Sequence, residues 1–303
     1  MHVLVTGAGG FIGRSVIRKV RAAGWQVTAV ARRPCVEADR IADLRQPLED
    51  WPAPDAVIHL AGGYAGASAR ELAGTDLAIA RNLIAWGQRA GVRRWVLASA
   101  AEVYGNIAGE ADENWPCRPV IPYGAAKLEM ERMFQTAGFR EVTICRLGEV
   151  YGREGRILHE IPGRLRRGFC PWPGNGRVRI SFLHVDDAAG ALVRACDGAA
   201  PGREIYNVGD RQPATWREFL DRIAAALGTR RAAFLPYSVA RCYAAIEWWR
   251  GRLLRRPGAV TPWVMQLLTT PKVLSSERIA KRLGFAPRYA GLESGLREAL
   301  GGI

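Results

Sequence analysis

The sequence has few of the residues that make a metal centre or a disulfide framework. Six cysteines and four histidines occur among 303 residues, the cysteines form no CxxC pair, and the histidines lie far apart. Scattered cysteines are typical of free thiols in a reducing compartment rather than of a small secreted domain. We therefore expect a cytoplasmic protein without a metal site, since zinc ligands usually come in closely spaced pairs.

Long apolar runs are also missing. The longest apolar stretch, residues 232–249, is interrupted by Arg241 and Glu247, whereas a membrane-spanning helix needs roughly 20 apolar residues. The N-terminus lacks the basic start and long apolar stretch of a signal peptide. We expect neither a spanning helix nor a signal sequence.

Acidic residues are in deficit: 29 Asp and Glu stand against 43 Lys and Arg, for a net charge of +14. Such a charge attracts anions in general, whether nucleic acid, acidic membrane or a phosphorylated ligand. No recognisable nucleic-acid module accompanies it, so we expect no specific nucleic-acid partner.

Short apolar runs alternate with helix-length segments through the first half of the chain. Alternating βα units with strands buried on both faces are typical of an α/β fold of the Rossmann type, with a doubly wound parallel sheet. We expect a dinucleotide-binding domain over 1–150, with 180–210 folding back onto it. A smaller mixed, mostly helical substrate lobe is expected over 151–303. The expected strands are His2–Val5, Gln26–Ala31, Ala56–Leu60, Trp95–Ser99 and Val142–Leu147.

A glycine-rich turn follows the first expected strand. Gly7, Gly10 and Gly13 are spaced as in a dinucleotide fingerprint, and Phe11 and Ile12 open the next helix. Glycines there permit a tight turn, close approach of the pyrophosphate and helix–strand packing, while the helix N-terminus supplies N–H donors. We expect these five residues to bind a nicotinamide dinucleotide.

The second expected strand ends at Ala31 and is followed by Arg32 and Arg33. An acidic residue there suits the ribose 2′-hydroxyl of NAD, whereas arginine suits the 2′-phosphate of NADP. We therefore favour NADP, with NAD as the alternative if both arginines are solvated surface charges.

Further cofactor contacts are expected at the ends of later strands. Asp43 and Leu44 are spaced to meet the adenine, and the small residues that follow the third strand let backbone border the cofactor. We interpret His59, at the end of that strand, as structural. The expected contacts after it are Leu60, Ala61 and Gly62.

Tyr123 and Lys127 lie four residues apart at the start of an expected helix, so their side chains share one face. A free tyrosine has a pKa of about 10, and a neighbouring ammonium favours its phenolate. We expect Tyr123 to exchange the proton of a substrate hydroxyl during hydride transfer, while Lys127 tunes it and holds the nicotinamide ribose.

Taken together, these motifs resemble the extended short-chain dehydrogenase/reductases, the NAD-dependent epimerase/dehydratase family. The resemblance covers nearly the whole chain in family order. It implies a nicotinamide-dependent oxidoreductase or epimerase, a nucleotide-activated sugar as the favoured substrate class, and a homodimer. The remaining matching segments are Glu102–Gly105, Arg146…Val150–Gly152, Phe182–Asp187, Tyr206–Gly209 and Leu283…Pro287.

One position departs from the family pattern. The catalytic Ser or Thr expected three residues before Val103 is replaced by Ala100, and the nearest hydroxyl belongs to Ser99. Neighbouring residues of a strand point to opposite faces, so Ser99 orients substrate only if the strand end is kinked. Glu102 is a second candidate catalytic residue, although the acid partner that a dehydratase carries beside it is absent.

The basic residues of the second half leave the substrate open. By the resemblance, Arg177 and Arg179 would face a substrate diphosphate, while the aromatic and arginine-rich segment 234–256 is a possible peripheral membrane contact. A reductase of a lipophilic ketone, of the hydroxysteroid or dihydroflavonol kind, is therefore the alternative enzyme. The third hypothesis is a noncatalytic regulator that binds a dinucleotide. Ala100, in place of the usual catalytic hydroxyl, supports this hypothesis, whereas the presence of Tyr123 argues against it.

Overall fold

A computed structural model describes residues 1–48, 51–63, 65–198, 202–253 and 261–301. Its centre is a parallel sheet of seven strands in the order β11-β6-β5-β4-β1-β2-β3. The expected Rossmann-type α/β fold is confirmed. The strands are β1 (His2–Thr6), β2 (Gln26–Ala31), β3 (Arg40–Ile41), β4 (Ala56–His59), β5 (Arg94–Ala100), β6 (Glu141–Leu147) and β11 (Gly202–Val208).

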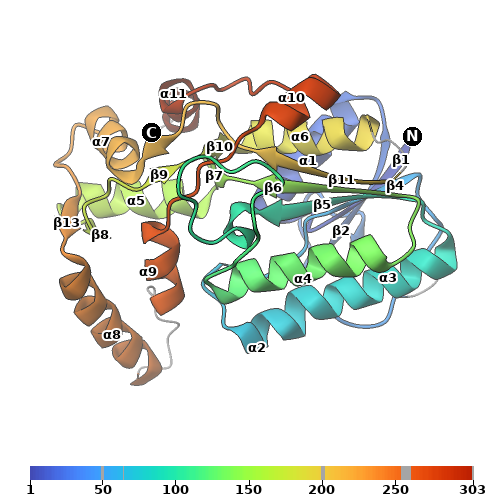
Figure 1. The fold of residues 1–303 in the computed structure, drawn as a ribbon, viewed down its shortest axis with the longest axis horizontal. Helices are drawn as coiled ribbons and strands as arrows, with labels where there is room; N and C mark the ends of the chain where they lie inside the picture. The colour runs from blue at the N-terminus through green and yellow to red at the C-terminus, as the bar shows by residue number, and fades with distance from the viewer. Residues whose placement is uncertain (49–50, 64, 199–201, 254–260, 302–303) are drawn as a thin grey trace.

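Helices cover both faces of this sheet (Figure 1). On one face, α1 (Phe11–Ala22) packs beside α6 (Val185–Asp197). On the other lie α3 (Ala78–Ala90) and α4 (Pro122–Thr136). Every residue of β6 is buried between the two layers, including the polar Glu141, Thr143 and Arg146. Burial on both faces is typical of a central strand in a parallel sheet.

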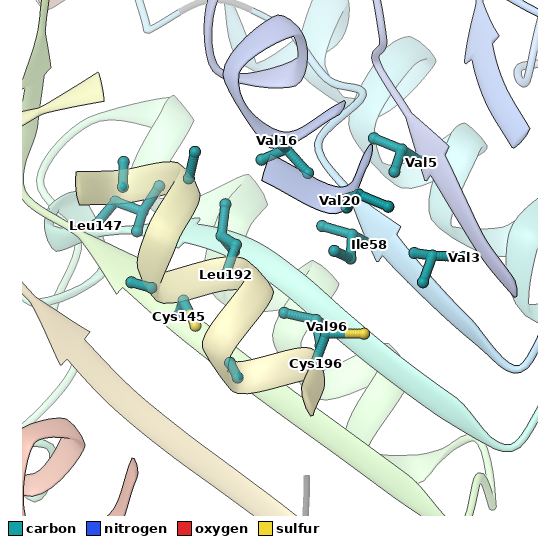
Figure 2. Packing of buried hydrophobic residues seen from close by; sticks show 14 of the residues in the cluster. Val3, Val5, Val16, Val20, Ile58, Val96, Cys145, Leu147, Leu192 and Cys196 are labelled. Carbon is teal, nitrogen blue, oxygen red and sulfur yellow. The ribbon is translucent and has the colours of Figure 1, made fainter. Parts of the chain in front are cut away.

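The core beneath α1 and α6 is built from small and branched side chains (Figure 2). Val16 and Val20 of α1 and Leu192 of α6 belong to one buried cluster with Val5 and Ile58 of the sheet. These five residues are at most 1% exposed, so the helices approach the strands closely and fix the loops at the strand ends.

The chain reverses direction across the sheet between β1 and β4. From β1 it passes outward to β2 and β3, and then returns to continue through β4, β5 and β6 in the opposite direction. Ligands of open parallel sheets bind outside the carboxyl ends of the strands at such a switch point. The fold therefore places its crevice at the ends of β1 and β4.

The helical segment between β4 and β5 is interrupted by a π-helical turn. It begins as α2 (Ala69–Leu72), capped by reciprocal hydrogen bonds between Ser68 and Glu71, passes through a π-helical turn over Ala73–Leu77, and continues as α3. The extra residue of a π-turn rotates the following side chains, and such turns are frequent at functional sites.

The rest of the chain forms a second lobe around an aromatic cluster. Phe182 stacks on Phe219 at 4.7 Å between ring centroids, and Tyr151 and Trp216 meet Phe219 edge-on. The strands of this lobe are β7 (Glu149–Tyr151), β8 (Pro171–Pro173), β9 (Arg179–Ile180), β10 (Phe182–His184), β12 (Ala214–Thr215) and β13 (Ala233–Leu235). Its helices are α5 (Arg156–Arg166), α7 (Trp216–Ala226), α8 (Tyr237–Leu253), α9 (Pro262–Thr269) and α11 (Leu292–Leu300). Helix α10 (Glu277–Leu283) instead packs on β11 and belongs to the core of α1 and α6.

An extended strap, residues 270–275, joins the two lobes. The Lys272 N–H donates to the carbonyl of Arg179, and the Lys272 carbonyl accepts from the Ser181 N–H. On its other side, the strap exchanges hydrogen bonds with Ala111 through Val273 and Ser275. The strap thus fixes the second lobe against the loop that follows β5.

Over the part of the chain that the structure describes, no helix is long and apolar enough to cross a membrane. Within the same residues, no group of three or more His, Cys, Asp or Glu side chains is placed to hold a metal ion.

Candidate functional site

A cavity of about 470 Å³ opens at the carboxyl ends of β1, β4 and β5. It brings together most of the residues singled out from the sequence, although they come from four separate segments. The expected residues that line it are Gly7, Gly10, Phe11, Ile12, Gly13, Leu60, Gly62, Ser99, Glu102, Tyr123 and Lys127.

The turn between β1 and α1 requires glycine at two positions. Gly7 has φ +75°, a left-handed conformation that other residues rarely adopt, and a Cβ at Gly13 would collide with the carbonyl oxygen of Gly7. The N-cap of α1, Gly10, provides no side-chain hydrogen bond. The N–H groups of the first helical turn therefore remain available to an anion, as the pyrophosphate of a dinucleotide requires.

Two of the remaining cofactor candidates follow β2. Arg32 and Arg33 are exposed at its end, and neither forms an ion pair with another described residue. Their exposed guanidinium groups are suited to meet a phosphate, while the charge of Arg32 also helps to lower the pKa of Asp43. Neither belongs to the lining of the 470 Å³ cavity.

The other candidates, Asp43, Leu44 and Ala61, do not line the cavity either. Asp43 pairs with Arg45 at 2.5 Å, and the hydrogen bond from Arg45 lowers the pKa of Asp43 to about 2. Leu44 is buried, with its carbonyl accepting from Asn82 at 3.0 Å. Ala61 donates its N–H to the Thr6 hydroxyl at 3.3 Å.

Tyr123 and Lys127 both line the cavity, and the Lys127 ammonium lies 5.4 Å from the centre of the Tyr123 ring. Sequence reasoning missed the partner of that lysine. Asp76, from the π-helical turn, is fully buried and its Oδ1 lies 3.1 Å from Lys127 Nζ. A Cβ on Gly62 would come within 2.8 Å of the Asp76 carboxylate, so glycine is needed for this approach.

The charges around Tyr123 favour its neutral form in this structure. Burial raises the pKa of Tyr123, and the carboxylates of Glu102, Asp76 and Glu149 raise it further, against the lowering effect of Lys127. Burial lowers the pKa of Lys127, but Tyr123 and Asp76 outweigh it, so the net shift is upward. Tyr123 is therefore a phenol beside an ammonium at neutral pH, an arrangement that suits proton donation to a carbonyl oxygen.

Ser99 lines the cavity, but its hydroxyl donates to the Glu131 carboxylate. Glu131 is also paired with Arg146, at 2.6 Å between Nη2 and Oε2, and the side chains of this pair are at most 4% exposed. A hydroxyl carries one proton, so a Ser99 that donates to Glu131 offers only acceptor capacity to the cavity.

Glu102 lines the cavity and also takes part in an ionic bridge that connects the two lobes. Lys272 of the strap donates to Glu102 at 2.7 Å and to Glu149 at 2.9 Å. The Lys272 side chain is 2% exposed, whereas those of Glu102 and Glu149 keep 11% and 16% exposure. Burial lowers the pKa of Lys272, but the two carboxylates outweigh it and raise the pKa, so the Lys272 ammonium keeps its charge.

A second cavity, of about 710 Å³, adjoins the first. Phe11, Ala65, Glu149, Val150 and Leu267 line both, so the two spaces are continuous. Apolar side chains from α5, β8, β13, α8 and α9 dominate its wall. They include Ile157, Ile161, Trp172, Leu235, Met265 and Leu268.

Three arginines of the α5 region are the cationic residues lining this second cavity. Arg156 and Arg164 each lie 2.8 Å from the Glu160 carboxylate, and Arg167 lines the wall beyond them. Arg177 and Arg179, singled out from the sequence, are both exposed and line neither of the two cavities.

His59 at the end of β4 is 1% exposed, and its Nδ1 lies 2.8 Å from the Thr6 hydroxyl. Burial lowers its pKa to about 3, so the ring is neutral. These features accord with the structural interpretation of His59.

Comparison with known proteins places this geometry in a family. The family model described as "NAD dependent epimerase/dehydratase family" matches residues 3–209. The 2-alkyl-3-oxoalkanoate reductase of Stenotrophomonas maltophilia is 26% identical, and the match covers 98% of each chain. A ketoreductase of a farnesyl-dihydroquinoline oxide from Stigmatella aurantiaca is 25% identical, over 99% of this chain and 96% of that one.

A solved structure of MoeE5 with UDP-glucuronic acid and NAD superposes with a TM-score of 0.80 at 27% identity, covering 99% of this chain and 98% of that one. The chain belongs to the NAD-dependent epimerase/dehydratase family, whose members are NAD(P)-dependent enzymes of the extended short-chain dehydrogenase/reductase type.

Proposed function

We propose that the chain is an NADP(H)-dependent reductase that converts a ketone of a lipophilic substrate to the alcohol. The observation that carries this is the apolar 710 Å³ cavity continuous with the cleft that holds Tyr123. Cavities of this size and lining suit a mostly apolar small molecule with its polar group at one end. Two relatives, the oxoalkanoate reductase and the farnesyl-dihydroquinoline ketoreductase, are named for substrates with alkyl or isoprenoid chains.

Bound in the cleft, a nicotinamide dinucleotide would supply the hydride to the carbonyl carbon. Tyr123 donates its phenolic proton to the carbonyl oxygen as that oxygen gains negative charge. The neighbouring Lys127 ammonium stabilises the phenolate that remains, and Asp76 holds the ammonium in place. The carboxylates of Glu102 and Glu149 disfavour an anionic group near Tyr123. Any acidic part of a substrate would therefore lie in the second cavity, toward Arg164 and Arg167.

The proposal is tested by NADPH oxidation with a series of 3-oxo esters of increasing chain length. Each added methylene contributes ~0.8 kcal/mol when buried, so kcat/KM should rise about fourfold per methylene until the cavity is filled. Tyr123→Phe should lower kcat by a factor of ~10² to 10⁴ without weakening NADPH binding. A kcat/KM that does not depend on chain length would contradict the substrate class.

The preference for NADP is proposed from Arg32 and Arg33. Charged hydrogen bonds contribute roughly 1.5–3 kcal/mol, so Arg32→Ala/Arg33→Ala should weaken NADPH binding by about 10- to 100-fold and leave NADH binding unchanged. Titration of both nucleotides by calorimetry checks this. Equal affinities of the unmodified protein for NADH and NADPH would refute the preference.

A second candidate is an epimerase of a nucleotide-activated sugar. The arginines of the cavity wall, Arg156, Arg164 and Arg167, favour it because they can neutralise a diphosphate, and MoeE5 was solved with UDP-glucuronic acid. Native mass spectrometry with UDP-, GDP- and dTDP-sugars distinguishes the two. Binding of a nucleotide sugar, together with no turnover of any 3-oxo ester, would favour the epimerase.

A further inference from the structure

Helix α8 is apolar on the side that faces solvent. Its inner side is made of small residues: Ala240 and Ala244 are 5% and 6% exposed and pack against Met265 and Leu235. Residues of a helix advance by about 100° each, so the opposite side lies on a different set of positions. Among the α8 residues whose side chains the structure describes, this outward face includes Val239, Cys242, Tyr243, Ile246 and Trp249, all of them exposed.

The exposure of this face is large for such side chains. Val239 is 50% exposed, Ile246 57% and Trp249 65%. The helix lies at the end of the molecule farthest from the N-terminus and contacts mainly α9 and β8 (Figure 1). A contiguous apolar patch of this kind marks an interaction surface rather than a chance arrangement of single residues.

The same face adjoins the mouth of the apolar cavity. Tyr243 lines the cavity and is 38% exposed, and Phe169, from the segment after α5, lines it and is 61% exposed. A residue that both lines a cavity and meets solvent stands at its opening. The outward face of α8 therefore continues into the space that would hold the lipophilic substrate.

The charges near this face are basic. Arg241 on α8 is exposed, and so is Arg167, which lines the cavity together with Tyr243. In the sequence, residues 234–256 contain five arginines and one glutamate. Arg255 and Arg256, which belong to that segment, lie outside the described residues. Exposed apolar side chains with a basic surround are the pattern of a surface that binds anionic lipid.

We propose that the outward face of α8 docks on an anionic lipid bilayer and that the lipophilic substrate enters the cavity from that bilayer. Entry of a lipophilic ketone from the bilayer rests on the proposed function, which identifies that ketone as the substrate. The docking itself depends only on the side chains of α8 and the neighbouring arginines.

The first test is co-sedimentation with vesicles of phosphatidylcholine containing about one-third phosphatidylglycerol, and with vesicles of phosphatidylcholine alone. The protein should bind the anionic vesicles, and added salt should weaken that binding. Val239→Gln/Ile246→Gln should weaken it at least tenfold, because two apolar side chains that enter the lipid are lost without a change of charge. The matched control is Ile41→Gln, at a 50% exposed site on β3, which should bind as the unmodified protein does.

The second test separates docking from catalysis. With NADPH, the Val239→Gln/Ile246→Gln protein should reduce ethyl acetoacetate in solution at the unmodified rate, yet lose at least tenfold in rate on ethyl 3-oxododecanoate held in anionic vesicles. Reductase activity without vesicle binding would overturn the docking alone. Vesicle binding without turnover of either ester would instead contradict the proposed function.

A second copy of the chain is the competing occupant of this face. If light scattering shows a dimer in the absence of lipid, and Val239→Gln/Ile246→Gln converts it to a monomer, the face is a subunit interface and the docking proposal is wrong. An unchanged mass, together with lost vesicle binding, supports the lipid surface.

Discussion

Replacing Lys272 by methionine should destabilise the protein far more than removing any surface lysine. The change keeps most of the side-chain volume but deletes the ammonium that lies between Glu102 and Glu149. Removing one partner of a buried ion pair costs roughly 3–5 kcal/mol, because the remaining charge stays desolvated. The two carboxylates keep 11% and 16% exposure toward the cavity, so water screens them in part and we expect a loss of about 3 kcal/mol.

The assay is urea denaturation followed by circular dichroism, with the midpoint and the slope measured separately. The matched control is Lys281→Met, which removes an ammonium paired with Glu277 where the two side chains are 75% and 66% exposed. That change should leave the free energy of unfolding unaltered, since exposed ion pairs contribute little.

The reasoning also predicts a partial rescue. In Lys272→Met/Glu102→Gln, one of the two opposed carboxylates becomes neutral, so the double variant should be more stable than Lys272→Met alone although it carries an additional substitution. The reasoning would be refuted if the free energy of unfolding of Lys272→Met lies within about 1 kcal/mol of that of the unmodified protein. It would also be refuted if adding Glu102→Gln does not restore stability, because the bridge would then not hold the two lobes together.

Three further predictions concern residues of the cleft. The pKa of His59 is lowered to about 3, so folding favours the neutral imidazole. The stabilisation from this group is fully present above pH 6.5. The free energy of unfolding should then fall by about 1.4 kcal/mol per pH unit as the pH drops from 6.5 toward 3. His59→Gln should flatten the acid limb of the stability curve measured by denaturation at each pH, and an unchanged limb would refute the assignment. Ser99→Ala should lower stability by about 1–3 kcal/mol, because buried Glu131 loses a donor, while kcat falls less than tenfold; a kcat loss near 10²-fold would instead make Ser99 an orienting donor to the substrate. Asp76→Asn should move the alkaline limb of the kcat profile to lower pH, because Asp76 raises the pKa of both Tyr123 and Lys127, and a limb that stays in place would exclude this coupling.

The fold could be predicted because its signals are local. Strands β1, β4 and β5 each contain a short apolar run. The glycine spacing of residues 7–13 needs only neighbouring residues to define its turn. Tyr123 and Lys127 are one helical turn apart, so their proximity follows from helix geometry. These parts of the site were therefore accessible from the sequence.

The partners of these residues were not accessible in the same way. Lys272 meets Glu102 across 170 positions of the chain, and no periodic pattern connects them. Asp76 did leave a signal, since it shares the apolar side of its helix with Leu72 and Ile79, where a carboxylate needs a buried partner. The apolar cavity is assembled from five elements of the second lobe, and no single segment reveals it.

The strap over residues 270–275 also has a consequence for the order in which the protein matures. During synthesis, Glu102 and Glu149 are made long before Lys272, so their carboxylates have no counter-ion from the strap until Lys272 follows. Completion of the cleft must therefore wait for a residue that is made 170 positions after Glu102 and 123 positions after Glu149. A chain truncated before residue 272 would have a cleft that lacks its ionic bridge.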